Sequence, residues 1–211
     1  CRVREGKSDP RFLHVDRKRY GNEKGSEPVR NYHQSILVAL AAMICFRCSV
    51  SAQLVDSLVW RSTLDGRYTV TRDVLYSPVD SVHNRLDLYL PVDTSQPKQA
   101  FLWFHGGGWS RGTKDSSQAN VLQFLRMGWV VVNVNYRLAP AALAPAAVED
   151  GRCALRWLFR NARALRVDTA RIVVGGGSAG GHLALMTGML KNGNPFDRLC
   201  PGDEALRVAA I

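Results

Sequence analysis

Three short, almost continuously apolar runs limit the folds open to this chain more than any other feature. A strand covered on both faces has this pattern, whereas a strand with one solvated face alternates apolar and polar residues. Segments of helical character separate the runs, and strands that alternate with such helices pair in parallel. The sequence therefore predicts an α/β fold, with a mostly parallel sheet and helices on both faces. The runs are residues 99–104 (QAFLWF), 129–135 (WVVVNVN) and 171–175 (RIVVG).

The other regular segments agree with this prediction. Residues 68–76 and 86–90 alternate apolar and polar residues, as half-buried antiparallel strands do. Residues 207–211 (RVAAI) begin a further apolar run. A domain seldom ends inside such a strand, because the strand's backbone groups would lack partners, so we interpret the chain as C-terminally truncated. We expect helices at residues 116–127, 145–162 and 178–190.

The first 52 residues have the features of a targeting segment. Residues 36–46 are apolar but too short to span a bilayer, and the small-residue pattern Val50-Ser51-Ala52 follows them. The alternative is a short buried helix. A signal peptide predicts a secreted or periplasmic protein with no stable membrane insertion. We divide the chain into upstream translated sequence (residues 1–28), a signal peptide (29–52), a connector (53–64) and the N-terminal part of a folded domain (65–211).

The net charge of +10 does not by itself indicate a nucleic-acid partner. Residues 1–34 carry nine Lys/Arg and five Asp/Glu, and the later basic residues are scattered, with no interleaved aromatic residues. One basic row recurs at spacings of three and four on the helix expected at residues 145–162, and we interpret it as a solvated helix face. We therefore expect no nucleic-acid partner. The row comprises Arg152, Arg156, Arg160 and Arg163.

The five cysteines do not predict a metal site. Cys45 and Cys48 form a CxxC pair, but no second pair follows at zinc spacing. Cys153 and Cys200 lie in the predicted domain, and the sequence allows them either to form a disulfide or to stay free. We predict neither a metal ion nor a cofactor.

A G-x-S-x-G motif, GGSAG at residues 176–180, lies directly between a predicted buried strand and a predicted helix. A sharp strand-to-helix turn forces the serine into a strained backbone conformation, so its neighbours must be small. Ser178 would then project its hydroxyl at the C-terminal edge of the sheet. It would also sit at a helix N-terminus, which favours a developing oxyanion. The motif predicts Ser178 as a nucleophile.

The same glycines satisfy a second pattern. Gly175, Gly177 and Gly180 match G-x-G-x-x-G after a strand and at the start of a helix, as in a dinucleotide site. That fingerprint is expected at the first βα turn of its unit, whereas this turn is a late one. A nucleotide site would also leave a second glycine segment unexplained.

The second glycine segment is HGGGW at residues 105–109, immediately after the first buried strand. Acyl transfer creates an oxyanion that needs at least two donors, usually backbone N–H groups. In an α/β-hydrolase one donor comes from the residue after the nucleophile and another from a loop of this type. The predicted oxyanion hole is therefore Ala179 with Gly106 or Gly107. This interpretation requires the glycine loop to lie beside Ser178.

Three motifs in order, HGGGW (105–109), NYRLAP (135–140) and GGSAGGHLA (176–184), give the chain a specific resemblance. It resembles the hormone-sensitive-lipase-like and feruloyl/acetylxylan-esterase-like (BD-FAE) branch of the α/β-hydrolase superfamily. The resemblance covers about residues 65–211. It implies an α/β-hydrolase fold and a carboxylic ester hydrolase, an esterase or lipase.

The resemblance also implies roles for single residues. Ser178 is the nucleophile, and Gly106, Gly107 and Ala179 supply the oxyanion hole. His105 braces the glycine loop rather than transferring protons. The positions of Asp150 and His182 are filled in this family by structural helix residues.

A base and a carboxylate for Ser178 are not evident in the sequence. In this fold the triad follows the order Ser, Asp or Glu, His. His182 lies one helical turn after the serine, so its side chain would lie beside the helix instead of over the site. Asp197, Asp203 and Glu204 come too early for the acid. The resemblance therefore places both partners beyond Ile211, and we expect this fragment to be inactive.

Several functions stay open at this stage. The leading hypothesis is hydrolysis of short-acyl, acetyl or feruloyl esters, on small molecules or linked to polysaccharide. A serine peptidase of similar fold, a non-catalytic binding module that keeps the fold, and a nucleotide-binding domain are the alternatives. The sequence does not define an oligomeric state.

Overall fold

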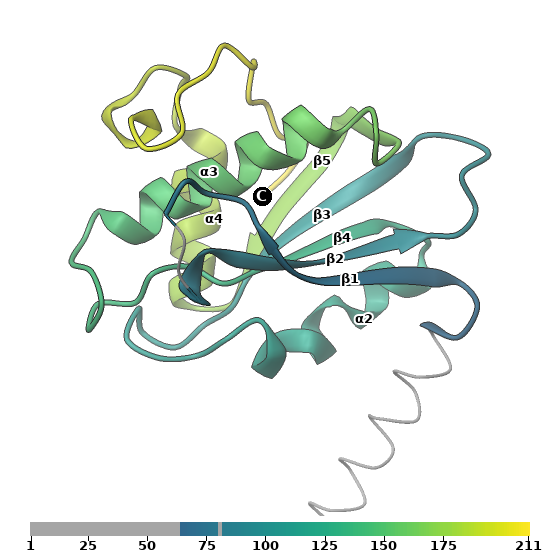
Figure 1. Cartoon of the computed structure of the whole chain (residues 1–211), viewed down its shortest axis with the longest axis horizontal. Helices are drawn as coiled ribbons and strands as arrows, with labels where there is room; N and C mark the ends of the chain where they lie inside the picture. Colours follow the sequence, from purple (N-terminus) through teal and green to yellow (C-terminus); the bar gives the residue numbers. More distant parts are fainter. Residues whose placement is uncertain (1–63, 80–81) are drawn as a thin grey trace, which may run out of the picture. The chain divides into compact units, whose positions relative to one another are not determined.

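The described residues form a sheet of five strands in the spatial order β1-β2-β4-β3-β5 (Figure 1). The computed structural model describes residues 64–79 and 82–211. Strands β4, β3 and β5 pair in parallel, and β2 and β1 extend the sheet antiparallel from β4. The predicted α/β class is confirmed, with the buried runs at its centre. The strands are β1 (Tyr68–Leu75), β2 (Arg85–Pro91), β3 (Lys98–Phe104), β4 (Val130–Val134) and β5 (Val167–Gly176).

Helices cover both faces of the sheet, as predicted. Leu102 of β3 belongs to the core under α3 and α4, whereas its neighbour Phe101 belongs to the core under α2. All five residues of β4 are buried, as a strand covered on both faces requires. Figure 1 shows α3 and α2 on opposite sides of the sheet, and α4 packs into the same core as α3. The elements are α2 (Gln118–Arg126), α3 (Ala146–Asn161) and α4 (Ala179–Met189), with short 3₁₀ turns η1 (Val82–Asn84), η2 (Asp115–Ser117) and η3 (Pro195–Asp197).

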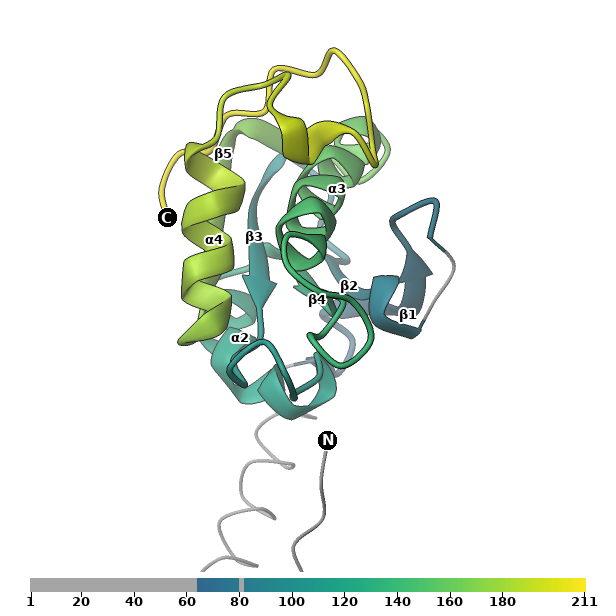
Figure 2. The ribbon, with the colours of Figure 1, turned by 90° about the vertical axis from the view of Figure 1, so that its left-hand side faces the viewer.

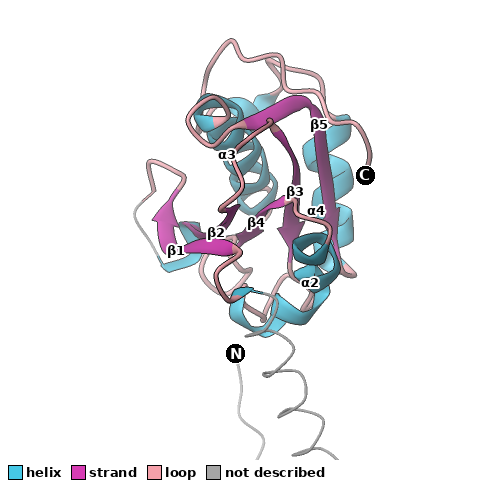
Figure 3. Cartoon of the chain, turned by 90° about the vertical axis from the view of Figure 1, so that its right-hand side faces the viewer, coloured by secondary structure: helices cyan, strands magenta, loops and turns pink. Residues whose placement is uncertain are grey.

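The last residues of the sequence begin to pair with β5, as the apolar run at residues 207–211 predicted. Ala210 forms a parallel bridge with Val173. The Ala209 N–H donates to the Ile172 carbonyl at 2.7 Å, and the Val174 N–H donates to the Ala210 carbonyl at 3.1 Å. Figures 2 and 3 show this segment beside β5 and α4.

The prediction of a solvated arginine face on α3 is wrong for Arg152 and Arg156. Both side chains are only 1% exposed. The segment after α4 folds back over α3, and its carboxylates neutralise them: Arg152 Nε lies 2.7 Å from Asp197, and Arg156 Nη1 lies 2.6 Å from Glu204. Arg160, whose side chain is 48% exposed, shares Glu204. Helical spacing alone does not reveal a covering segment that lies 45 residues further along the chain.

The two cysteines of the domain form a disulfide between α3 and the segment that covers it. Cys153 and Cys200 are bonded, with their Cα atoms 5.3 Å apart. Of the two states that the sequence allowed, a disulfide or free thiols, the structure contains the disulfide. The bond and the Arg152–Asp197 pair fasten the same covering segment to the same helix.

Several predicted features lie outside the described residues. They are the upstream segment, the signal peptide, most of the connector and the Cys45–Cys48 pair. In the part of the chain that the structure describes, none of the helices combines the length and the apolar character needed to cross a bilayer.

Candidate active site

Ser178 occupies a strained turn between β5 and α4. Its φ and ψ are 51° and −113°, in a region that L-residues seldom adopt. The turn is possible because its neighbours are glycines: a Cβ on Gly176 would clash with the Gly180 backbone. A Cβ on Gly180 would clash with the Phe104 carbonyl oxygen at the end of β3. The predicted requirement for small residues around Ser178 therefore has a direct steric cause.

The glycine loop after β3 packs against this turn, as the prediction requires. A Cβ on Gly106 would lie 2.9 Å from the Gly177 carbonyl oxygen and 3.8 Å from the Ser178 Cβ. The Gly177 N–H donates to the Phe104 carbonyl at 3.3 Å. The structure thus brings Gly106 and Ser178 together, although more than 70 residues of sequence separate them.

Three backbone amides, two in the glycine loop and one at the start of α4, make no hydrogen bond to any other described residue. Within residues 64–79 and 82–211, no hydrogen bond uses the N–H of Gly106, Gly107 or Ala179. The Ala179 amide belongs to the first turn of α4, where N–H groups lack helical acceptors and carry partial positive charge. These are the three residues predicted to form the oxyanion hole.

The glycine loop closes in a tight turn of its own. Gly107 has φ of 127°, and its carbonyl accepts hydrogen bonds from the N–H groups of Ser110 and Arg111, each at 3.2 Å. A Cβ on Gly107 would clash with the Arg111 carbonyl. The glycine is therefore needed both for its backbone angle and for space.

His105 supports this loop from within the protein. Its ring is stacked on Tyr136 with 4.3 Å between centroids, and the Tyr136 hydroxyl donates to the His105 carbonyl at 2.8 Å. His105 Nδ1 lies 2.8 Å from the Gly106 carbonyl, which can only accept, so Nδ1 carries the proton. Burial lowers the pKa of His105, which favours the neutral ring. The contacts agree with a bracing role.

Asp150 fixes the loop after β4. Its buried carboxylate accepts a hydrogen bond from the Arg137 N–H at 2.7 Å and from Arg137 Nε at 3.0 Å. The Arg137 guanidinium also lies 3.3 Å from Glu149. Burial raises the pKa of Asp150 despite these hydrogen bonds. Both carboxylate oxygens of Asp150 therefore hold this loop, which is consistent with the structural role that the resemblance implied.

The Ser178 hydroxyl itself makes no hydrogen bond within the described ranges. His182 lies one turn further along α4, where its ring meets the edge of Trp109 with 5.4 Å between centroids. Asp197 and Glu204 are held by the α3 arginines. Burial acts to raise the pKa of Asp197, but the Arg152 and Arg156 charges and the Gly193 N–H hold it below its usual value.

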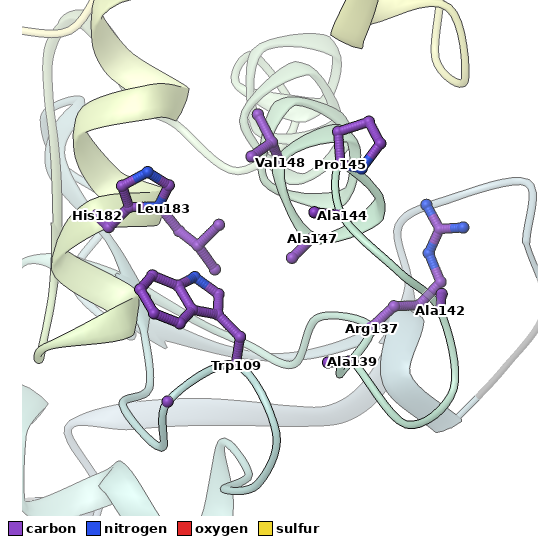
Figure 4. Close-up of a pocket in the computed structure, with 11 residues that line it drawn as sticks. Trp109, Arg137, Ala139, Ala142, Ala144, Pro145, Ala147, Val148, His182 and Leu183 are labelled. Atoms are coloured by element: carbon purple, nitrogen blue, oxygen red, sulfur yellow. The ribbon is translucent and has the colours of Figure 1, made fainter.

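A cavity of about 480 Å³ opens beside the glycine loop. Ser178 is not in its wall, but the loop that carries Gly106 and the helix that follows Ser178 both contribute to it. Figure 4 shows Trp109, His182 and Leu183 on one side, with the start of α3 on the other. We call it the Trp109 cavity; its lining includes Trp109, Arg137, Ala142, Ala147, His182 and Leu183.

The sequence did not predict the residue that anchors the far end of the glycine loop. Lys114 is buried, and its Nζ lies 2.9 Å from both Asp73 and Asp87. Its backbone N–H donates to Asn135 Oδ1 at 2.6 Å, and its carbonyl accepts from Asn133 Nδ2 at 2.8 Å. Nothing in the residues around Lys114 in the sequence indicates that its side chain is buried, because its partners Asp73 and Asp87 are distant along the chain.

No group of three or more His, Cys, Asp or Glu side chains in the described part of the chain is arranged to hold a metal ion.

A mixed sheet with a strained serine between a strand and a helix, and a glycine loop packed against it, defines the α/β-hydrolase fold. The BD-FAE family model matches residues 86–211. The chain belongs to the BD-FAE family.

Similar proteins are esterases or proteins of the same superfamily. The chain is 43% identical over 152 residues to Esterase LipI of Mycobacterium tuberculosis, covering 63% of this chain and 48% of that protein. It is 46% identical over 87 residues to an AB hydrolase superfamily protein of Schizosaccharomyces pombe, covering 40% and 25%. The chain thus spans between a quarter and a half of the length of these relatives.

Solved structures agree with the sequence relatives. A bacterial heroin esterase superposes with a TM-score of 0.50 at 34% identity, covering 63% of this chain and 43% of that one. An esterase from Pyrobaculum calidifontis gives 0.51 at 31% identity, covering 63% and 42%. A truncated carbohydrate esterase from gut microbiota gives 0.57 at 26% identity, covering 69% and 50%.

Proposed function

We propose that the protein is a serine carboxylester hydrolase in which Ser178 is the nucleophile. The observation that carries the proposal is the contact between the Gly106 loop and the strained Ser178 turn, which supports an oxyanion hole made of the amides of Gly106, Gly107 and Ala179. Preorganised donors of this kind stabilise the charge that develops when a hydroxyl attacks an ester carbonyl. The esterases among the relatives support the same class of reaction.

The proposed reaction has two stages. The Ser178 oxygen attacks the ester carbonyl while the N–H groups of Gly106, Gly107 and Ala179 receive the negative oxygen. The C–O bond to the alcohol then breaks, and the alcohol leaves with the serine proton. Water hydrolyses the acyl-enzyme, which releases the acid and restores the hydroxyl.

Both stages need a base, and we propose that it comes from outside the described residues. Ser178 has no hydrogen-bond partner there, and the relatives are two to four times as long as the matched region. The order of the triad in this fold puts the carboxylate and the histidine after the serine along the chain. The 211-residue chain alone is then expected not to turn over esters.

The proposed substrates are short-acyl, acetyl or feruloyl esters, on small molecules or linked to polysaccharide, and the proposed location is secreted or periplasmic. The Cys153–Cys200 disulfide supports an oxidising compartment. The carbohydrate esterase among the structural relatives supports the polysaccharide-linked alternative.

The test uses the complete gene product, a fluorophosphonate probe and p-nitrophenyl acetate. We expect covalent labelling and turnover, with Ser178→Ala abolishing the label and lowering kcat by at least about 10⁴-fold. Ser95→Ala, an exposed serine before β3, is the matched control and should leave both unchanged. Absence of labelling in the complete protein would favour a non-catalytic binding module. Turnover by the 211-residue chain comparable to the complete protein would contradict the external base.

A further inference from the structure

Lys114 is a buried cation at the end of the loop that carries Gly106 and Gly107. Its side chain is only 4% exposed, and its Nζ lies 2.9 Å from Asp87 of β2, whose carboxylate is fully buried. Burial acts to lower the pKa of Lys114, but its carboxylate partners hold the pKa above its usual value, so the side chain stays charged. Separating the two side chains would leave a carboxylate in the interior without its buried cation, so the position of Lys114 is strongly fixed.

The backbone of Lys114 is also fixed to the sheet. Its N–H donates to Asn135 Oδ1 at 2.6 Å, and its carbonyl accepts hydrogen bonds from Asn133 Nδ2 at 2.8 Å and from the Ser117 hydroxyl at 3.0 Å. Asn133 belongs to β4, and Asn135 follows that strand directly. Lys114 therefore ties the end of the loop to β2 through its side chain and to β4 through its backbone.

Gly112, two residues before Lys114, connects this anchor to the predicted oxyanion residues. Its φ is 101°, and a Cβ there would clash with the Gly106 carbonyl oxygen and would lie 2.7 Å from His105 Nδ1. Only a residue without a side chain lets the chain pass this close to the Gly106 peptide. The loop is thus folded back on itself, with its anchored end packed against its first glycine.

The Gly106 carbonyl and the Gly107 N–H belong to one planar peptide group and point in opposite directions. Contacts that fix the carbonyl therefore also fix the direction of the Gly107 N–H. His105 Nδ1 holds the carbonyl at 2.8 Å, and Gly112 packs against it. Release of the loop at Lys114 would let Gly112 move away and would free this peptide to rotate.

We propose that Lys114, through its ion pair with Asp87, is a positioning residue for the oxyanion hole. It holds the amides of Gly106 and Gly107 in the geometry that receives the negative oxygen, and it acts only through the loop. This proposal rests on the proposed hydrolysis at Ser178 and adds to it the residue that keeps two of the three donors in place. A displacement of about 1 Å in a catalytic group is enough to lower a rate about 10²-fold.

The kinetic test uses the complete gene product, p-nitrophenyl acetate and Lys114→Met, which removes the charge but keeps a long side chain. We expect kcat per active site, with sites counted by exhaustive fluorophosphonate labelling, to fall about 10- to 100-fold. Both stages of the reaction use the same amides, so KM should change less than about twofold. A loss of folded protein alone would lower the number of labelled sites and leave kcat per site unchanged.

Arg72→Ala is the matched control. Arg72 pairs with the same carboxylate, 3.2 Å from Asp87, but it comes from β1 and its side chain is 51% exposed. Its removal changes the charge around Asp87 without releasing the loop. It should leave kcat per site and KM unchanged.

Gly112→Ala provides a second variant if Lys114→Met does not fold, because its Cβ meets the Gly106 carbonyl directly. Gly128→Ala is the control for this change. Gly128 also has a left-handed φ, of 78°, but among the described residues a Cβ there would meet no atom within 4 Å. Both changes strain the backbone, so a fall in kcat per site for Gly112→Ala alone is due to displacement of the loop.

A spectroscopic arm keeps the test independent of catalysis. In protein labelled with ¹⁵N at glycine, Lys114→Met should shift the amide resonances of Gly106, Gly107 and Gly112, and Arg72→Ala should not. Unchanged resonances in a folded Lys114→Met variant, or shifted resonances with an unchanged kcat per site, would overturn the proposal. If the wild-type protein hydrolyses no ester and takes no label, the proposed function fails, and the resonances still report whether Lys114 holds the loop.

Discussion

Two regions of this domain are held together in opposite ways. The turn at Ser178 is packed backbone against backbone. Its glycines have no side chains, so β3, β5 and α4 can approach one another closely. The covered face of α3 is packed by charged side chains, since Arg152 and Arg156 are buried under residues 190–206. Added atoms at the closest backbone contacts should destabilise the first region, and removal of a buried charge should destabilise the second. The two regions should therefore fail under different substitutions.

The largest expected effect is in the charged region. Asp197→Ala would leave Arg152 buried without its carboxylate, and an uncompensated buried charge costs about 3–5 kcal/mol. The free energy of unfolding, measured with urea, should fall by that amount. Arg160→Ala removes a half-exposed pair on the same helix and should cost less than about 1 kcal/mol. Similar losses for both variants would show that burial of the pair does not matter.

The next effect is in the glycine region. Alanine normally favours a helix over glycine by about 1 kcal/mol, yet Gly180→Ala should destabilise the protein by about 2–3 kcal/mol, because its Cβ meets the Phe104 and His105 carbonyls. Gly181→Ala is the matched control in the same turn. Its Cβ would lie 3.2 Å from the Gly176 carbonyl oxygen, and the change should stay within about 1 kcal/mol. Equal melting temperatures for the two variants would contradict the steric account.

The same contrast explains which features the sequence could predict. The spacing of glycines shows where the backbone must turn sharply or approach another segment. The motif at residues 176–180 and the loop at 105–109 therefore predicted the contact between them that the structure contains. Apolar runs report burial on both faces, so β3, β4 and β5 were predicted as well. Burial of a polar side chain depends on which distant segment covers it, and neither the α3 arginines nor Lys114 carry that information locally.

The Trp109 cavity was only partly predictable from the sequence. Its walls come from α3, α4 and the loops after β3 and β4, and each contributes small or apolar residues that have ordinary structural explanations in the sequence. Only the fold shows that Ala147 and Trp109 face one hollow. Tyr136 belongs to the NYRLAP motif, but the sequence does not show which residue it contacts. Its stacking on His105 follows from the pairing of β3 with β4.

The smallest expected effect tests His105, the histidine that supports the glycine loop from within the protein. Burial lowers the pKa of His105, with a contribution in the same direction from His83, and the hydrogen bond to Gly106 only partly offsets it. A histidine with a lower pKa in the folded state binds its proton more readily when unfolded, so the free energy of unfolding should fall as the pH drops below about 6.5. His105→Asn keeps a side-chain donor but does not titrate, and it should flatten this dependence between pH 7 and 5 in urea unfolding. An unchanged slope in that variant would mean that another group causes the acid sensitivity, and that the neutral ring of His105 is not what holds the Gly106 carbonyl.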